Sequence, residues 1–567
     1  MDEQVYNLFC YNKDISMDLK TSVKLALLNV MKESITDVEV FKRPFELEFL
    51  KKDEYFNIIK DIIEQRFIKA FDIISNKNES FTALKELKIN PLRNILVPKK
   101  TLFDFRKCGY IEPLDEIIYL SLAIMLSNKI ERERIHKKSK IVYSYRLKPD
   151  LIKEQKPTYL FDLKINYTSF RNDVSNKVKD PKIRVIVSCD ISNFYDRLNL
   201  HRLENTLLAI TGIDIQAVKL LNEMLLYWSN RDSYGIPVGS NASRILAEAS
   251  LINVDRYLFD KGINFSRYVD DFRLFANSAS QAHSWLSILV ERLNQEGLFL
   301  NTSKTSIVSA SEIKQSRSVE IPQNQNTDVE MEKSELPLII RGYSGLIPTK
   351  FRKLSNREKI NLSNININEY KKRKIDIDLI DPKDLLKHIR TLVAQEEWKE
   401  LATASTVLRR FPQFTPYYLD CIIKHTDSLK DHKDLIIKTV IELANDSNIL
   451  EYLRIYVIRF LSNEVFLSKK VVINSYYQLK RSEGVYLGRA ILECIENYVI
   501  RDDLLEIKKD FVRADSAEKR QILKLLKLKL NESEFNAFYK NISLNDNDLW
   551  YDFIAKMKMD HLTPAST

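Results

Sequence analysis

Two adjacent aspartates, Asp270 and Asp271, lie in the apolar segment FSRYVDDFRLF at residues 265–275. Neighbouring carboxylates repel each other, and burying either one costs free energy unless a cation or hydrogen bonds compensate its charge. The surrounding aromatic and branched residues predict a short β-hairpin with Val269, Asp270 and Asp271 at its turn. A divalent metal ion can hold two carboxylates together and fix their geometry. The segment therefore predicts a metal site at the tip of a hairpin.

A third carboxylate, Asp190, ends the β-rich run KIRVIVSCD at residues 182–190. Two metal ions roughly 3.5–4 Å apart can activate an attacking hydroxyl and stabilise a leaving pyrophosphate, as the extension of a nucleic-acid strand requires. Mg²⁺ takes one or two carboxylates from a protein and further oxygens from substrate phosphates. Between Asp190 and the aspartate pair lies GIPVGSNAS (235–243), whose glycines and proline predict a loop that opens a helix and lets backbone approach a substrate.

Four blocks of this sequence resemble the reverse-transcriptase palm and follow its order. They are DISNFYD (190–196), GIPVGSNAS (235–243), YVDD (268–271) and GLFLNTSKT (297–305). The resemblance covers about residues 90–310. Within that superfamily, IVYSYR (141–146), SRILAE (243–248) and a long helical C-terminal region are similar to the bacterial defence-associated reverse transcriptases, in the abortive-infection group typified by AbiK.

This resemblance implies a metal-binding and nucleotide-binding set. Asp190, Asp270 and Asp271 would be catalytic metal ligands, together with the main-chain carbonyl of Ile191. Tyr195 would be the steric gate beneath the sugar, which implies the use of dNTPs. The plain alternatives are structural ion pairs or turn aspartates for the acids, and a core position for the tyrosine.

The remaining site residues are basic. Lys304, in the block after the aspartate pair, would donate a proton to pyrophosphate or steer the triphosphate. In a fingers-like region, Arg106 and Lys100, with Lys99, would clamp the triphosphate by charge-assisted hydrogen bonds. A solvated surface position is the alternative for each lysine. Arg146 would contact nucleic acid or brace the fold.

Gly239 and the loop before it would line the nucleotide and template position, but the sequence departs here from the common pattern. Val238 stands where many reverse transcriptases have glutamine, and Arg244 stands where many have proline. A valine side chain forms no hydrogen bonds. This departure favours a weak or unusual grip on a template.

Composition restricts the class of protein. The formal net charge of +10 is a mild indication of polyanionic partners. The five cysteines include no C-x-x-C pair, which favours a reducing compartment over disulfides or cysteine-bound zinc. The first residues carry no signal-peptide pattern, and the longest apolar run, IIYLSLAIML, is too short to span a bilayer. We therefore expect a soluble, cytoplasmic protein without membrane contact.

The expected fold is α+β: a reverse-transcriptase fingers and palm domain followed by an all-α, HEAT-like helical-repeat domain. Residues 1–345 would form the first domain, with helices over 1–90 and the family blocks within 90–310. Residues 346–567 would form the second, because amphipathic helical segments recur there every 15–25 residues. The polar, aperiodic stretch 310–345 predicts a linker or mobile loop.

Three functions remain open from the sequence. The first is Mg²⁺-dependent DNA synthesis from dNTPs in anti-phage defence, with Mn²⁺ as a substitute metal, untemplated and started on a protein hydroxyl. The second is reverse transcription of a specific noncoding RNA as template. The third is a non-catalytic scaffold that binds RNA or a phage protein. The departure at Val238 favours the first, and the resemblance also implies a homo-oligomer.

Overall fold

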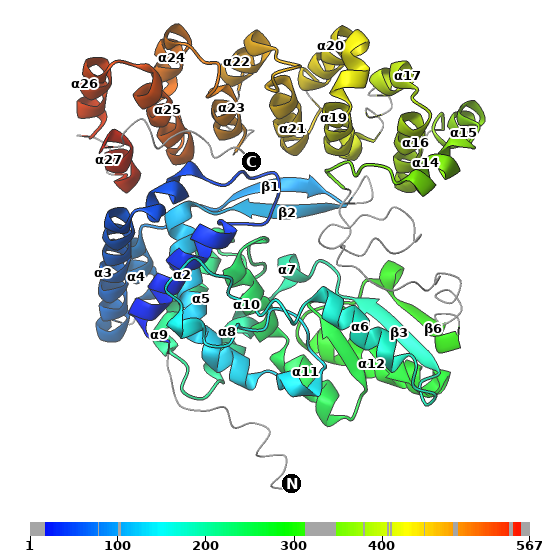
Figure 1. Ribbon diagram of the computed structural model, residues 1–567. Helices are drawn as coiled ribbons and strands as arrows, with labels where there is room; N and C mark the ends of the chain where they lie inside the picture. The colour runs from blue at the N-terminus through cyan, green and yellow to red at the C-terminus, as the bar shows by residue number, and fades with distance from the viewer. Residues whose placement is uncertain are drawn as a thin grey trace. The chain divides into compact units, whose positions relative to one another are not determined.

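The chain divides into two compact units in the computed structural model. The first comprises Met1–Leu92 and Gly109–Val329, and the second comprises Arg93–Cys108 and Glu330–Thr567 (Figure 1). The structure describes residues 17–77, 79–99, 104–311, 348–377, 380–404, 408, 411–446, 448–479, 486–543 and 548–556. The predicted fold class is confirmed: small sheets accompany predominant helices, and an additional helical region follows. The expected domain boundaries, 1–345 and 346–567, remain predictions.

The first unit combines helices with a four-stranded sheet. Its helices are α2 (Leu19–Glu33), α3 (Asp53–Lys77), α4 (Ser80–Leu87), α5 (Pro113–Glu133), α6 (Tyr167–Lys177), α7 (Phe194–Arg197), α8 (Leu200–Leu208), α9 (Ile215–Trp228), α10 (Asn241–Ser250), α11 (Ile252–Asp260) and α12 (Ala279–Gln295). Its strands are β3 (Val185–Asp190), β4 (Phe265–Tyr268), β5 (Asp271–Ala276) and β6 (Ser306–Ser309).

Helix α5 is the central helix of the first unit. Pro113 occupies its first turn, where a missing N–H costs nothing. Its apolar residues lie on nearly every side, and α2, α9 and α10 pack against it. A helix that is apolar all round is a buried helix. The sequence of residues 114–134 predicts this helix, and the structure confirms it. Helix α5 supports α10, the helix that follows the glycine-containing loop.

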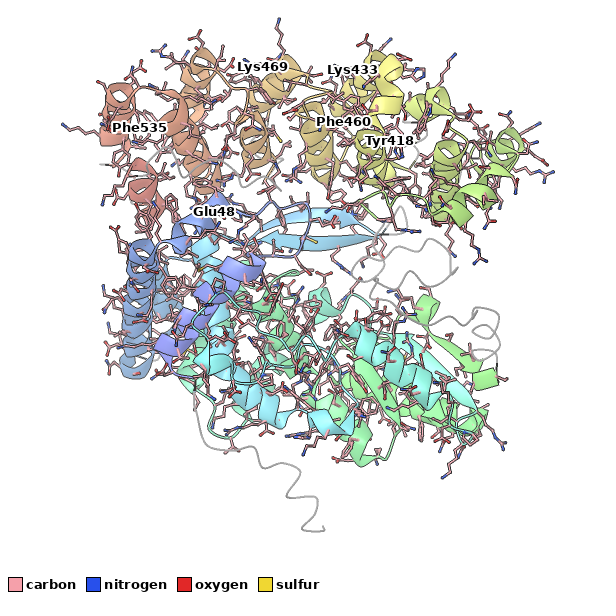
Figure 2. All side chains as sticks on the ribbon, viewed as in Figure 1. Glu48, Tyr418, Lys433, Phe460, Lys469 and Phe535 are labelled. Carbon is pink, nitrogen blue, oxygen red and sulfur yellow. The ribbon has the colours of Figure 1, made fainter. Side chains whose placement is uncertain are left out.

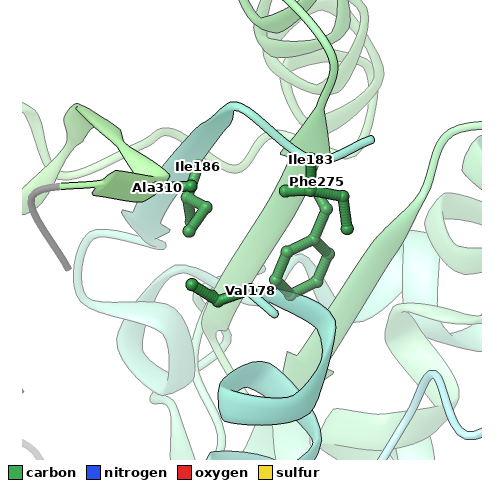
Figure 3. Close-up of a cluster of buried hydrophobic side chains, with 5 residues drawn as sticks. All are labelled: Val178, Ile183, Ile186, Phe275 and Ala310. Carbon is green, nitrogen blue, oxygen red and sulfur yellow. The ribbon is translucent and has the colours of Figure 1, made fainter. Parts of the chain in front are cut away.

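The sheet has the strand order β4–β5–β3–β6, and its neighbouring strands are antiparallel. Helix α12 packs against β3 and β5, while α6 packs against β4. A small apolar cluster lies beside the central strands (Figure 3). It consists of Val178, Ile183, Ile186, Phe275 and Ala310. Because Ile186 and Phe275 are cross-strand partners, this cluster fixes the register of the two strands that carry the aspartates.

The second unit contains a two-stranded sheet and a long series of helices. The strands are β1 (Arg93–Pro98) and β2 (Phe105–Tyr110), although the last two residues of β2 belong to the first unit. The helices are α14 (Asn356–Ser363), α15 (Ile367–Lys374), α16 (Pro382–Ala394), α17 (Trp398–Thr403), α19 (Thr415–Lys424), α20 (Lys433–Ala444), α21 (Glu451–Leu461), α22 (Lys469–Tyr477), α23 (Leu487–Ile495), α24 (Arg501–Ile507), α25 (Ser516–Lys529), α26 (Glu532–Ser543) and α27 (Leu549–Lys556).

These helices stack as a solenoid. Alternate helices are packed neighbours, as in the series α19, α21, α23, α25 and α27. Phe460 stacks on Phe466 with ring centroids 4.5 Å apart, and the Tyr418 hydroxyl donates to the Leu401 carbonyl at 2.8 Å. Figure 2 shows Tyr418 and Phe460 within this helical layer, and Lys433 and Lys469 at one edge of it. Strand β1 packs against α21 within the same unit.

The structure differs from several local expectations. The sequence predicts one helix over 239–262 after its glycine, but the helix is broken at Leu251, where the Ser250 hydroxyl donates back to the Ala247 carbonyl at 2.8 Å. Such side-chain bonds compete with the helix ladder. The sequence also predicts a strand over 298–309, but the strand is confined to β6 and is preceded by a short 3₁₀ turn. The linker expected over 310–345 lies almost wholly outside the described residues.

The long helices of the described part include none with the length and apolar content needed to cross a membrane. The basic run at residues 371–374 lies on α15, where Lys371, Arg373 and Lys374 each pair with an acidic side chain. That run is therefore a charge-balanced surface of the second unit.

Candidate active site

The three aspartates meet at one end of the four-stranded sheet. Strand β3 ends at Asp190 and β5 begins at Asp271, and these two residues are direct cross-strand partners. Asp270 lies in the two-residue turn between β4 and β5. The sequence placed Asp271 in that turn, but the ladder starts one residue earlier because Asp271 pairs with both Asp190 and Tyr268. Asp190 is buried, whereas Asp270 and Asp271 are half-buried.

Backbone contacts hold this tip of the sheet. Val269 has a φ of +55°, a left-handed conformation that is costly for a β-branched residue. The Ile191 N–H donates to the Asp270 carbonyl at 3.2 Å, and the Asn301 N–H donates to the Asp190 carbonyl at 2.7 Å. Ile191 also forms an isolated bridge with Leu300. The block GLFLNTSKT thus lies beside β3 and fixes the backbone on which the carboxylates sit.

The surroundings of Asp270 and Asp271 raise the pKa of both carboxyl groups. Burial, followed by the negative charges of Asp190 and Asp271, raises the pKa of Asp270 to about 7. Burial also raises the pKa of Asp271, while the nearby Arg273 guanidinium opposes that shift. Perturbed carboxylates of this kind gather at functional sites. The cluster holds more negative charge than its protein surroundings compensate.

Lys304 is one cation that faces the cluster. Its Nζ lies 2.7 Å from Asp190 Oδ2, although the lysine side chain is half-exposed. Lys304 is the last residue of the short 3₁₀ turn (Thr302–Lys304) that precedes β6. The structure therefore brings Lys304 together with the aspartates, as a direct ion-pair partner of Asp190.

The donor set suits a hard cation, because carboxylate oxygens are the ligands that Mg²⁺ prefers. In the described part of the chain, however, no group of three or more His, Cys, Asp or Glu side chains is already arranged to hold a metal ion. One oxygen of Asp190 is bonded to Lys304. A metal ion bound at Asp190 Oδ2 would therefore compete with Lys304 for that oxygen.

Tyr195 lies on the short helix α7 close to the glycine-containing loop. Its ring is buried against Phe194, with centroids 5.6 Å apart. Its carbonyl accepts a hydrogen bond from the Ile236 N–H at 3.0 Å. Two of the blocks that resemble the reverse-transcriptase palm, DISNFYD and GIPVGSNAS, are therefore in contact.

Gly239 is covered by a segment of the same unit. Its carbonyl accepts from the Asp37 N–H at 3.3 Å, and Thr36 and Val38 fill the space beside its Cα. Arg244 forms an ion pair with Asp37, and its guanidinium lies 5.1 Å from the centre of the Tyr145 ring. The arginine that replaces the common proline thus anchors the segment Thr36–Val38 over this loop.

Gly239→Ala is expected to lower the free energy of unfolding by about 2–4 kcal/mol. Gly239 has a φ of +105°, and a Cβ there would meet Thr36 Oγ1 and lie 2.8 Å from Val38 Cγ2. Gly262→Ala is the matched control, since Gly262 has a φ of +67° with nothing within 4 Å of a new Cβ. It should cost only about 1 kcal/mol. Equal costs in denaturant unfolding would contradict the packing of Thr36 and Val38 on Gly239.

The other basic residues that the sequence singled out are placed differently. Arg106 lies on β2 in the second unit and is half-buried. Lys100 lies outside the described residues, and Lys99 forms an ion pair with Asp104 at 3.0 Å. Their contact with a triphosphate remains a prediction. Arg146, in contrast, is buried and bonds to Glu131 and to main-chain carbonyls, so it braces the fold.

Sequence reasoning missed Arg267, which lies three residues before Asp270. Its side chain is fully buried and bonds to Glu248, Asp255 and the Val269 carbonyl. Strand alternation would have predicted its burial, because Arg267 lies on the same face of the strand as the apolar Phe265. The partners on α10 and α11 could not be read from the sequence.

Comparison with known proteins supports the assignment of the first unit. Residues 135–330, which include all three aspartates, match the family described as reverse transcriptase (RNA-dependent DNA polymerase). No curated protein matches the chain.

Two similar solved structures are telomerases. One is telomerase from Candida albicans in complex with a TWJ fragment of telomeric RNA, with 14% identity, coverage of 71% of this chain and 66% of that chain, and a TM-score of 0.28. The other is apo telomerase from Candida tropicalis, with 11% identity, coverage of 92% and 93%, and a TM-score of 0.27. Scores this low support no inference about function. The family match and the three aspartates at the end of the sheet identify residues 135–330 as a reverse transcriptase domain, the fold of a nucleic-acid polymerase.

Proposed function

We propose that this protein is a divalent-metal-dependent polymerase that makes DNA from dNTPs. The observation that carries the proposal is the pairing of Asp190 with Asp271 on adjacent strands, with Asp270 in the adjoining turn. Three carboxylates within one matched reverse transcriptase domain supply the oxygen donors that such chemistry requires.

Asp190, Asp270 and Asp271, with the Ile191 carbonyl, would hold Mg²⁺, and Mn²⁺ would substitute for it. When bound, the metal neutralises charge on the attacking hydroxyl and the leaving pyrophosphate. Lys304, which pairs with Asp190, would protonate or steer the pyrophosphate. Tyr195 would exclude a 2′-hydroxyl, and Arg106 and Lys100 would bind the triphosphate.

We favour DNA synthesis that uses no conventional template and that starts on a protein hydroxyl. The contact of Thr36 and Val38 with Gly239 supports this choice, because the loop expected to line the template is packed by the chain itself. The second candidate is copying of a bound noncoding RNA. The description of the matched family, an RNA-dependent DNA polymerase, favours that candidate.

The biological setting is proposed from the sequence blocks that resemble the abortive-infection group. We place the protein in anti-phage defence, in the cytoplasm, as a homo-oligomer that binds dNTPs, its DNA product and RNA. The absence of C-x-x-C pairs supports a reducing compartment.

The test is a synthesis assay on the purified full chain, with each labelled dNTP and Mg²⁺ but no added nucleic acid, before and after ribonuclease treatment. The Asp270→Asn/Asp271→Asn variant is measured beside the wild type, with Asp260→Asn on the exposed end of α11 as a control for the loss of a carboxylate away from the cluster. Protease-sensitive product that survives RNA removal supports untemplated, protein-primed synthesis. Product lost with the RNA supports the second candidate.

No product from folded wild-type protein, even with an added RNA template and primer, would contradict the polymerase proposal. It would leave the binding scaffold as the remaining function. Equal activity in the double variant would contradict the role of the aspartates.

A further inference from the structure

The fully buried guanidinium of Arg267 lies directly behind the aspartate turn. Arg267 is on β4, and each of its five N–H bonds has an acceptor. Nε and Nη2 donate to the two oxygens of Asp255 at 2.8 and 2.5 Å. Nη1 and Nη2 donate to the two oxygens of Glu248 at 3.2 and 2.9 Å. The fifth bond runs from Nη1 to the Val269 carbonyl at 2.8 Å.

The charges of this buried cluster balance. Glu248 also accepts from Arg134 Nη2 at 2.6 Å and from the Ser144 hydroxyl at 2.5 Å. Two arginines therefore face two carboxylates, all of them buried. Burying such charges is tolerable only when each is paired and hydrogen-bonded. The geometry of the cluster is thus rigidly specified by α10, α11 and the end of α5.

Four of the five hydrogen bonds of Arg267 go to the carboxylates that balance its charge, whereas the fifth goes to the neutral Val269 carbonyl. It reaches the one turn residue with a positive φ, directly before Asp270. A left-handed valine persists only where its surroundings hold it there. The Val269 side chain is buried, and its carbonyl is held by a guanidinium that is itself fixed by two bidentate carboxylates. The orientation of Asp270 depends on this turn.

We propose that Arg267 is a positioning residue of the active site. Its hydrogen bonds connect the Glu248–Asp255 cluster to the Val269–Asp270 turn and so hold Asp270 beside Asp190 and Asp271. The inference rests on the proposed polymerase function. In this proposal Arg267 contacts neither metal nor nucleotide and acts on Asp270 through the main-chain carbonyl of Val269. A displacement of a catalytic group by about 1 Å can cost on the order of a hundredfold in rate.

The test compares Arg267→Lys with Arg134→Lys. Both variants keep the positive charge and lose part of the hydrogen bonding to the same Glu248. The bonds of Arg134 run to Glu131, to Glu248 and to the carbonyls of Ser144 and Tyr145, which lie outside the turn. For Arg267→Lys we expect kcat to fall about 10–100-fold with the KM for dNTP within about threefold. The Mn²⁺ dissociation constant, from electron paramagnetic resonance of free Mn²⁺, should rise about tenfold.

Hydrogen exchange supplies a readout that needs no activity. In Arg267→Lys the peptide 265–275 should exchange faster than in the wild type, whereas Arg134→Lys should leave its rate unchanged. For Arg134→Lys, kcat per folded molecule should stay within about threefold of the wild type.

The outcomes separate the inference from the proposed function. Equal kcat, Mn²⁺ affinity and exchange in the two variants would overturn the positioning role while leaving the polymerase intact. An inactive wild type would overturn the polymerase, and Mn²⁺ affinity and exchange would still decide the role of Arg267. If Arg267→Lys does not fold, hydrogen exchange in the wild-type protein tests the role of Arg267. Exchange of residues 265–275 at rates well above those of β3 would contradict a turn that Arg267 holds in place.

Discussion

Asp190→Asn is expected to lower the rate of nucleotide incorporation by about 10²–10³-fold or more, with the fold retained. Asp190 is the buried carboxylate of the cluster, the cross-strand partner of Asp271 and the ion-pair partner of Lys304. Asparagine keeps the shape and one oxygen, but it has no charge with which to hold a divalent cation. The loss should appear chiefly in kcat, because the charge acts on the reacting groups rather than on the base or sugar.

The measurement is steady-state incorporation of labelled dNTP per folded molecule, with circular dichroism and thermal unfolding as checks on folding. Asp260→Asn removes the same charge from an exposed position at the end of α11 and should retain wild-type activity. Incorporation by Asp190→Asn at the wild-type rate would remove Asp190 from the catalytic set.

Asp270→Asn is expected to stabilise the metal-free protein at pH 8 by up to about 4 kcal/mol. Asp270 has a pKa of about 7 in the folded protein and an ordinary value of 3.8, because burial and the charges of Asp190 and Asp271 disfavour its ionised form. A raised carboxylate pKa contributes stability that is fully present below the unfolded value. That stability is lost as the pH rises from about 4 through about 7.

Asparagine stays neutral throughout and avoids this loss. The gain from Asp270→Asn should therefore shrink below about 1 kcal/mol at pH 4. Unfolding in denaturant at pH 4, 6 and 8, with a chelator present, measures the difference in the free energy of unfolding between Asp270→Asn and the wild type. Asp260→Asn serves again as the control and should show no comparable pH dependence.

Adding Mg²⁺ at pH 8 should stabilise the wild type and have a smaller effect on Asp270→Asn, since a ligand that binds only the folded state raises its stability. A gain that does not change with pH would contradict the electrostatic cause. Equal stabilisation of both proteins by Mg²⁺ would contradict a metal site at Asp270.

The sequence by itself determined the elements that carry the chemistry. The run Val185–Val187 before Asp190 and the alternating residues around Asp270 predicted the strand and the hairpin, because strand periodicity and turn position are local properties. The prediction that the three aspartates form one metal-binding set followed from the resemblance of four blocks to a known family. Recurring amphipathic segments likewise predicted the helical C-terminal region.

Only the tertiary structure decided how the aspartates are held. Arg267 finds Glu248 and Asp255 on helices 12–19 residues away in sequence, and Thr36 reaches Gly239 across about two hundred residues. The strand Arg93–Pro98 packs against α21, far along the chain. Local patterns predict which side chains must be buried. The partner that compensates a buried charge, or fills the space beside a glycine, depends on which distant segments the folded core brings together.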